Sequence, residues 1–212
     1  MTDKNAEKDK LLDAVLMHVM FDGWSAEAVK RAAGDLGIDR LDVDLHFPNG
    51  LRDMVTRHVE RADDKMEEVL AAQDLNVMKI REKITFAVRT RLELVEDQKD
   101  IVRKTLTWLS LPQNAGLGFK LTAGTMSRIW YGIGDSSTDF SYYTKRMTLS
   151  AVYGSTLLYW LDDMSEGHEK TWAFLDRRIE NVMQFEKAKF QTRQCLSKKP
   201  DFSFLPSPGR FF

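Results

Sequence analysis

Cysteine is nearly absent from this 212-residue chain, in which Cys195 is the single example. One cysteine cannot form an intramolecular disulfide, and it excludes a zinc site built from several thiolates. Cys195 lies in a basic stretch with no partner base beside it, so we interpret it as incidental. Cysteine usage of this kind is typical of a reducing compartment, and the cytosol is the expected location.

An excess of charge of either sign is also missing. Lys and Arg number 31 against 32 Asp and Glu, which gives a formal net charge of −1. The chain as a whole therefore carries no field that would attract nucleic acid or an acidic substrate.

Long apolar runs are absent as well. None approaches the roughly 18 residues that a membrane-spanning helix needs. The first ten residues mix acids with bases and lack the apolar centre of a secretory signal, and their acids disfavour a mitochondrial transit peptide. We therefore expect a cytoplasmic protein of bacterial type, whose contact with the inner membrane is peripheral.

Strand patterns are missing too, because no segment alternates convincingly with a period of two. Apolar residues instead recur at spacings of three and four, and 43% of the residues are hydrophobic. This pattern predicts an all-α bundle of about nine to ten helices. We divide the chain into a flexible N-terminus (1–10), a helix-turn-helix-like subdomain (11–50), a helical bundle (51–190) and a basic aromatic tail (191–212).

The segment before Gly50 resembles the N-terminal helix-turn-helix unit of TetR-type repressors. Its charges oppose DNA binding, because residues 25–50 contain five acids and three bases. The helix expected over 39–45 carries three acids against Arg40, whereas a helix that reads a DNA groove must neutralise phosphates. We interpret the unit as retained for packing or dimer formation, and we expect no nucleic-acid partner.

Catalytic and metal-binding motifs are not found. The four histidines show no ligand spacing, and the paired Glu-x-x-His motifs of a di-iron bundle are missing. No Gly-x-Ser-x-Gly elbow or phosphate loop occurs, and Gly132-x-Gly134 follows no strand, so it is not a dinucleotide fingerprint. We expect neither catalytic activity, nor a metal, nor a cofactor.

The helix expected from Phe140 to Leu161 combines two kinds of surface. Its first turn places tyrosines beside charges, which is typical of an interface. Its second half is apolar almost all round, which predicts a central buried helix. Small residues interrupt the bulky ones and indicate either close helix packing or an apolar pocket between helices: Ser150, Ala151, Gly154 and Ser155.

The C-terminal residues 186–212 contain six bases and two acids, interleaved with phenylalanines. Such a segment suits an anionic lipid surface, and it equally suits an unstructured tail.

A long motif resembles the Coq-nine family of ubiquinone-biosynthesis accessory proteins. It is Asp135-x-Ser137-Thr138-Asp139-Phe140-x-Tyr142-Tyr143-Thr144-Lys145-Arg146, continued by Leu149, Val152, Tyr153 and Thr156. Supporting segments are residues 23–28 (GWSAEA), 111–114 (LPQN) and 171–182 (TWAFLDRRIENV). The resemblance spans about residues 11–185.

This resemblance implies a TetR-like homodimer that no longer binds DNA and is not an oxidoreductase. The resemblance also implies that the chain binds a polyprenyl lipid in an apolar pocket and assists the di-iron enzyme demethoxyubiquinone hydroxylase by delivering its membrane-bound substrate. The hydroxylase-binding surface maps onto Asp139, Tyr142, Tyr143 and Arg146, and we add the neighbouring Lys145. We expect a bound lipid or isoprenoid quinone among Leu106, Leu109, Met126, Trp130, Met147, Leu149, Ala151, Tyr153, Leu157, Trp160, Trp172 and Leu175.

Overall fold

The computed structural model describes residues 2–136 and 140–197. Within these ranges it contains nine α-helices, three short 3-10 helices and no strand, which confirms the all-α prediction. Asp139 and residues 198–212 of the expected tail lie outside the described residues.

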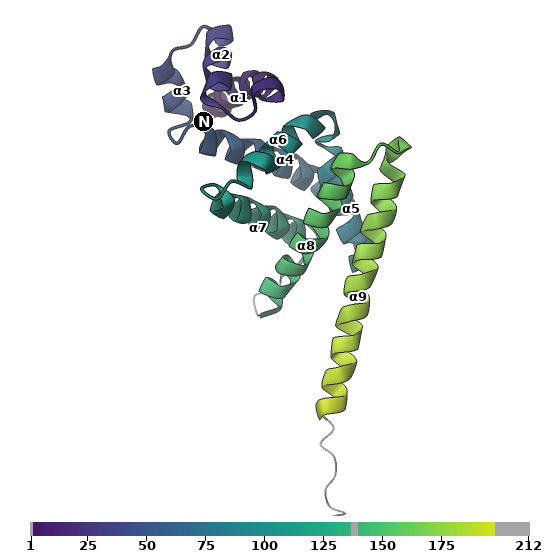
Figure 1. Ribbon diagram of the computed structural model, residues 1–212. Helices are drawn as coiled ribbons and strands as arrows, with labels where there is room; N and C mark the ends of the chain where they lie inside the picture. Colours follow the sequence, from purple (N-terminus) through teal and green to yellow (C-terminus); the bar gives the residue numbers. More distant parts are fainter. Residues whose placement is uncertain (1, 137–139, 198–212) are drawn as a thin grey trace, which may run out of the picture.

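The N-terminal unit consists of α1 (Thr2–Asp22), α2 (Ala26–Leu36) and α3 (Arg40–His46), at the top of Figure 1. Helix α1 begins well before the apolar pattern does, inside the segment expected to be flexible. The starts of α2 and α3 follow from their caps. Ser25 accepts a hydrogen bond from the Ala28 N–H, and Asp39 forms a capping box with Asp42.

The remaining helices form a bundle below this unit (Figure 1). They are α4 (Leu51–Ala72), α5 (Ile80–Glu93), α6 (Lys99–Leu109), α7 (Ala115–Gly132), α8 (Phe140–Asp162) and α9 (Glu169–Ser197), with 3-10 turns at Leu75–Val77, Glu96–Gln98 and Glu166–His168. Helices α4 and α7 approach closely at Gly132, where an added Cβ would lie 2.9 Å from Leu70 Cδ1. The two units are joined by a buried hydrogen bond of 2.9 Å from Trp24 Nε1 to Thr105 Oγ1.

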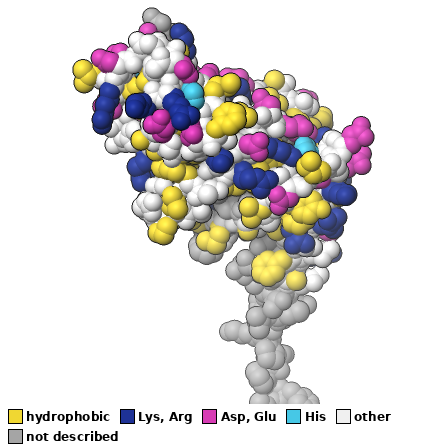
Figure 2. All heavy atoms as spheres, turned by 45° about the horizontal axis from the view of Figure 1, so that its top comes forward, with side chains coloured by type: hydrophobic (Ala, Val, Ile, Leu, Met, Phe, Trp, Pro, Cys, Tyr) yellow, Lys and Arg dark blue, Asp and Glu magenta, His cyan; other side chains and the backbone are white. Residues whose placement is uncertain are grey.

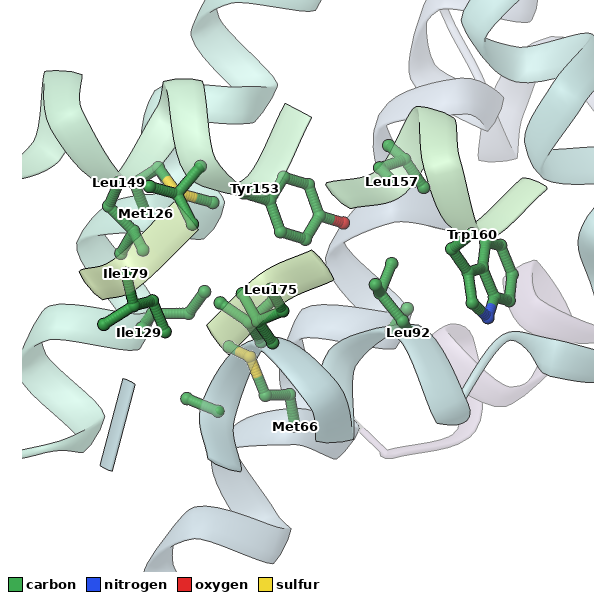
Figure 3. Close-up of a cluster of buried hydrophobic side chains, with 14 of the residues drawn as sticks. Met66, Leu92, Met126, Ile129, Leu149, Tyr153, Leu157, Trp160, Leu175 and Ile179 are labelled. Carbon is green, nitrogen blue, oxygen red and sulfur yellow. The ribbon is translucent and has the colours of Figure 1, made fainter. Parts of the chain in front are cut away.

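The bundle core is built from buried residues of α4, α5, α7, α8 and α9. Figure 3 shows Leu149, Tyr153, Leu157 and Trp160 of α8 spread along one side of this core, opposite apolar residues of the other helices. Burial of these side chains provides the main stabilisation of the bundle.

One face of α8 is exposed, which corrects the expectation of a helix buried all round. Tyr143, Met147 and Leu158 are 67%, 74% and 63% exposed, and Ala151 between them is also exposed. They follow one another at intervals of three or four residues through Gly154, so they share one face of the helix. The sequence pattern failed here because both faces carry apolar residues.

A buried ion pair connects three helices inside the bundle. Arg91 Nε of α5 donates to Asp63 Oδ1 of α4 at 2.6 Å. Thr125 Oγ1 of α7 donates to the other oxygen of that carboxylate at 2.8 Å. Asp63 is thus satisfied by partners on two neighbouring helices.

Asp163 organises the turn between α8 and α9. Its side chain accepts hydrogen bonds from the backbone N–H and the hydroxyl of both Ser165 and Thr171, over 2.6–2.9 Å. Burial opposes its ionisation, but these four bonds outweigh that effect and hold the pKa of Asp163 well below its ordinary value. The direction in which α9 leaves α8 therefore depends on this carboxylate.

The visible surface in Figure 2 carries Lys and Arg side chains interspersed with Asp and Glu, and it shows no single extended basic patch. In α3 the one arginine, Arg40, pairs with Asp44 at 3.7 Å. Among the described residues, no helix is long and apolar enough to cross a membrane.

Candidate functional site

The first candidate site is an aromatic and charged surface at the junction of α7 and α8, built around Arg146. The Arg146 guanidinium carbon lies 3.3 Å from the ring centroid of Tyr142 and 5.0 Å from that of Tyr131. Its Nε donates to Ser127 Oγ at 3.0 Å, and its Nη1 donates to the Tyr142 carbonyl at 3.2 Å. The guanidinium therefore holds the two tyrosines of neighbouring helices together.

The backbone at the end of α7 positions Asp135 beside this cluster. Gly134, at φ +88°, ends the helix in a left-handed conformation, and the Asp135 N–H bonds the Trp130 carbonyl at 2.9 Å. The Asp135 carboxylate accepts a hydrogen bond of 2.6 Å from Lys145 Nζ. Lys145 Nζ also lies 5.3 Å from the Trp130 ring centroid.

The predicted partner-binding residues differ in their accessibility. Tyr143 is largely exposed, whereas Tyr142 and Lys145 are half-buried. Arg146 is only 7% exposed, so it contacts the tyrosine rings from the inner side of this surface. Sequence analysis did not select Tyr131, which is 57% exposed. Its place beside Tyr142 depends on how α7 and α8 cross.

The second candidate site is a cavity of about 300 Å³ between α5, α7, α8 and α9. Two of the predicted lipid-binding residues, Trp130 and Leu149, line it. The sequence analysis missed the rest of its wall, which is Ile80, Arg81, Ile84, Thr144, Lys145, Thr148, Val152, Ile179, Val182 and Met183. Ile80 and Met183 are each 46% exposed, so the cavity reaches the surface. We call it the larger cavity.

A smaller cavity of about 80 Å³ lies between α4, α5, α6, α7 and α8. Four predicted lipid-binding residues line it: Leu106, Leu109, Tyr153 and Leu157. On a helix with 3.6 residues per turn, Leu149 and Val152 lie on one flank of the buried stripe of α8, and Tyr153 and Leu157 lie on the other. Helix α8 thus separates the two cavities.

The remaining predicted lipid-binding residues line neither cavity. Met126, Trp160 and Leu175 are fully buried in the core, and the indole of Trp172 is nearly buried, with Arg89 over its ring at 4.9 Å. Met147 and Ala151 lie on the exposed face of α8. Sequence spacing therefore identified apolar residues of α8 but did not distinguish the walls of a cavity from the core or the surface.

The described residues contain no group of three or more His, Cys, Asp or Glu side chains that could hold a metal ion. The chemistry available at both cavities is apolar contact together with a few hydrogen bonds, which suits binding.

Comparison with known proteins first defines the class of the fold. A TetR transcriptional regulator from Nitrosomonas europaea superposes with a TM-score of 0.70 over 84% of this chain and 99% of the regulator, at 17% identity. The chain therefore has a TetR-like fold.

The sequence comparisons show similarity to one family. The COQ9 family model matches residues 115–186. The chain is 32% identical to the mitochondrial ubiquinone biosynthesis protein COQ9 of Drosophila melanogaster, over 89% of this chain and 59% of that protein. It is 31% identical to the human protein of the same name, over 82% and 57% of the two chains. The chain thus spans less than two thirds of the length of these relatives, and over most of its own length it is similar to the COQ9, or Coq-nine, family.

Proposed function

We propose that the chain is a lipid-binding accessory protein of ubiquinone biosynthesis. In this proposal the larger cavity binds a polyprenyl quinone intermediate. The surface formed by Tyr142, Tyr143 and Arg146, which we call the tyrosine surface, presents that intermediate to demethoxyubiquinone hydroxylase. The family relationship supports the pathway, since the relatives are named ubiquinone biosynthesis proteins.

One observation carries the proposal: the first half of α8 belongs to both candidate sites. Thr144, Lys145 and Thr148 line the larger cavity. Tyr142, Tyr143 and Arg146, which alternate with them along the helix, form the tyrosine surface. An enzyme docked on that surface would therefore lie beside the mouth of the cavity.

The walls of the larger cavity suit an isoprenoid chain. Ile84, Val152 and Val182 offer apolar contact, and the volume of about 300 Å³ falls at the lower end of the range for ligand sites. A polyprenyl quinone is nearly insoluble in water, so burying even part of its tail lowers the cost of holding it outside a bilayer.

Lipid extraction tests the cavity. Organic extraction of the purified protein followed by mass spectrometry should recover a polyprenyl quinone. Replacing half-buried Thr148, which lines the cavity, with Phe fills the space and should remove that lipid. Met147→Phe, one residue away on the exposed face, is the matched control and should retain it. Wild-type protein that is reproducibly free of lipid contradicts the proposal.

Co-purification tests the presentation step. Tyr143→Ala should abolish capture of the hydroxylase while the lipid content and the helical circular dichroism spectrum stay unchanged. Undiminished capture would remove this surface from the proposal and leave lipid binding standing.

The proposal includes a homodimer that associates peripherally with the membrane. The exposed apolar face of α8 supports self-association, because Met147 and Leu158 leave apolar surface in water. Light scattering after size exclusion should give twice the chain mass for the wild type and a monomer for Leu158→Glu. A monomeric wild type would exclude the dimer.

A second candidate is a ligand-responsive transcriptional regulator, which the solved TetR structure favours through fold alone. Helix α3 argues against DNA binding by this candidate. Its Asp39 and Asp42 carboxylates form the capping box at its start, and its exposed Leu41 and Leu45 side chains are apolar. A salt-dependent gel shift on its own upstream DNA would support this candidate, and no shift at low salt would exclude it.

A further inference from the structure

Helix α3 exposes an apolar strip that neither candidate site uses. Leu41 and Leu45 are 77% and 62% exposed. Because they are four residues apart in the helix, their side chains lie one turn apart on the same face. Single exposed leucines are common on protein surfaces, whereas adjacent ones form a continuous apolar surface of the kind that contacts a partner.

The opposite face of α3 fixes the orientation of this strip. Val43 and Phe47 are buried in the core of the N-terminal unit. Lys8 Nζ of α1 lies 4.9 Å from the Phe47 ring centroid, and the capping box between Asp39 and Asp42 fixes the first turn. A partner therefore meets a preformed surface and does not have to order it, which lowers the cost of binding.

Carboxylates flank the strip on both sides. Successive residues of an α-helix are about 100° apart, so Asp44 projects about 60° to one side of Leu41, and Asp42 projects about 60° beyond Leu45 on the other side. Both aspartates are exposed. Arg40 Nε reaches Asp44 at 3.7 Å, but this is a long contact between exposed side chains and is therefore weak. The Asp44 carboxylate stays accessible to a second cation.

The charge of the whole N-terminal unit has the same sign as these flanks. Residues 2–50 contain ten acids and six bases, which gives a formal charge of −4. Residues 51–212 contain 22 acids and 25 bases, which gives +3. The near-neutral chain thus places its negative charge around α3, where it attracts cations over a longer range than the single carboxylates do.

This charge separates the classes of partner. Phosphates of nucleic acid and the headgroups of an anionic membrane would both be repelled by the unit. A second copy that docked through the same face would bring two net negative surfaces together. A surface that combines apolar residues with Lys or Arg complements both the leucines and the acids of α3.

We propose that the exposed face of α3 docks a basic amphipathic segment of another protein. Apolar side chains of that segment contact Leu41 and Leu45, and its Lys or Arg side chains pair with Asp42 and Asp44. This surface goes beyond the proposed function, because it includes no residue of the larger cavity or of the tyrosine surface.

Two matched peptides test the chemistry, each titrated into the 15N-labelled full chain. One is a short amphipathic helix of Leu and Lys, and the other has Glu at every Lys position. The Leu–Lys peptide should shift the backbone amides of α3 and bind roughly tenfold more tightly than the Leu–Glu peptide. Its affinity should fall as the ionic strength rises.

One variant removes the apolar strip. Leu41→Ser combined with Leu45→Ser should abolish the shifts in α3 while the helical circular dichroism spectrum stays unchanged. Phe119→Ser, at an apolar side chain of α7 that is equally exposed, is the matched control and should retain them. Unchanged binding by the double variant would overturn the proposal.

A second variant reverses a flanking charge. Asp44→Lys should weaken binding of the Leu–Lys peptide up to about fivefold, the effect of one exposed ion pair, and should strengthen binding of the Leu–Glu peptide. Damage to the fold would weaken both peptides, so the opposite signs identify a charge effect. A loss of both would contradict the assigned role of Asp44.

The remaining outcomes assign the surface to other occupants and overturn the proposal. Equal affinity of the two peptides would show that the acids are not used. Shifts in α3 with duplex DNA or with phosphatidylglycerol vesicles would show a phosphate-binding surface, and shifts that depend on protein concentration would show a second copy. Shifts in α3 caused by replacing Lys198, Lys199 and Arg210 of the full chain with Gln would show that its own C-terminal residues occupy the surface.

Discussion

Arg91 Nε and Asp63 Oδ1 lie 2.6 Å apart, between side chains that are both almost fully buried. Burial disfavours the arginine charge, but Tyr153 and Asp63 outweigh that effect and raise the pKa of Arg91. Two buried charges stabilise a fold only while each keeps its partner.

Removing one member of this ion pair should therefore lower the stability of the fold strongly. Arg91→Met leaves Asp63 charged and buried, and it should lower the free energy of unfolding by about 3–5 kcal/mol in urea denaturation at pH 7. The double variant Arg91→Met with Asp63→Leu removes both charges and should recover most of that loss. Full additivity of the two single changes would contradict a coupled pair.

His58 should make the fold sensitive to mild acid. Its pKa falls from 6.5 to about 4 on folding, mainly through burial. A lowered histidine pKa contributes stability above pH 6.5, and this contribution is lost as the pH falls toward 4, because the unfolded chain takes up the proton first.

The full shift corresponds to roughly 3 kcal/mol. His58→Leu should remove this part of the pH dependence in urea melts between pH 7 and pH 4.5. The same slope in the variant and the wild type would assign the effect to other groups.

Asp163 should stabilise the fold at neutral pH and contribute less stability in strong acid. Because its pKa is lowered on folding, its contribution is present above the ordinary value of 3.8 and is lost as the pH falls below it. Asp163→Asn should lower the free energy of unfolding by about 1.5–3 kcal/mol at pH 7, the range for hydrogen bonds to a charged group.

A neighbouring residue provides the control. Asp162 is exposed and pairs with Arg103 at 3.1 Å, so Asp162→Asn should change the unfolding free energy by less than about 1 kcal/mol. If both variants lower the unfolding free energy by the same amount, Asp163 does not organise the turn between α8 and α9 as described.

Arg146 should control partner binding without touching the partner. Arg146→Lys keeps the charge but loses the planar group that lies against the Tyr142 ring, and a cation–π contact contributes roughly 0.5–2 kcal/mol. We expect weaker capture of the hydroxylase with unchanged lipid content. Full capture by Arg146→Lys would show that charge alone suffices.

Local patterns in the sequence predicted the helices well. Asp39 marks the start of α3 because its carboxylate caps the first turn, and such caps are visible in sequence. The long motif beginning at Asp135 likewise pointed to the Coq-nine family, and it lies within residues 115–186, which the COQ9 family model matches.

The cavities could not be predicted in the same way. Met147 and Leu149 are both apolar, yet one is exposed and the other lines the larger cavity. Which face of α8 is covered depends on how α7 and α9 pack against it, and side-chain periodicity does not record that packing. For the same reason, Ile84 and Val182 were missed as cavity residues.

The position of α8 between two cavities makes their volumes interdependent. Val152 and Tyr153 are consecutive residues that face different cavities. A small rotation of the helix about its own axis moves one of them inward as the other retreats, so space gained on one flank is lost on the other. Ligands bound on the two flanks would then be thermodynamically antagonistic, and each would weaken the binding of the other by the same factor.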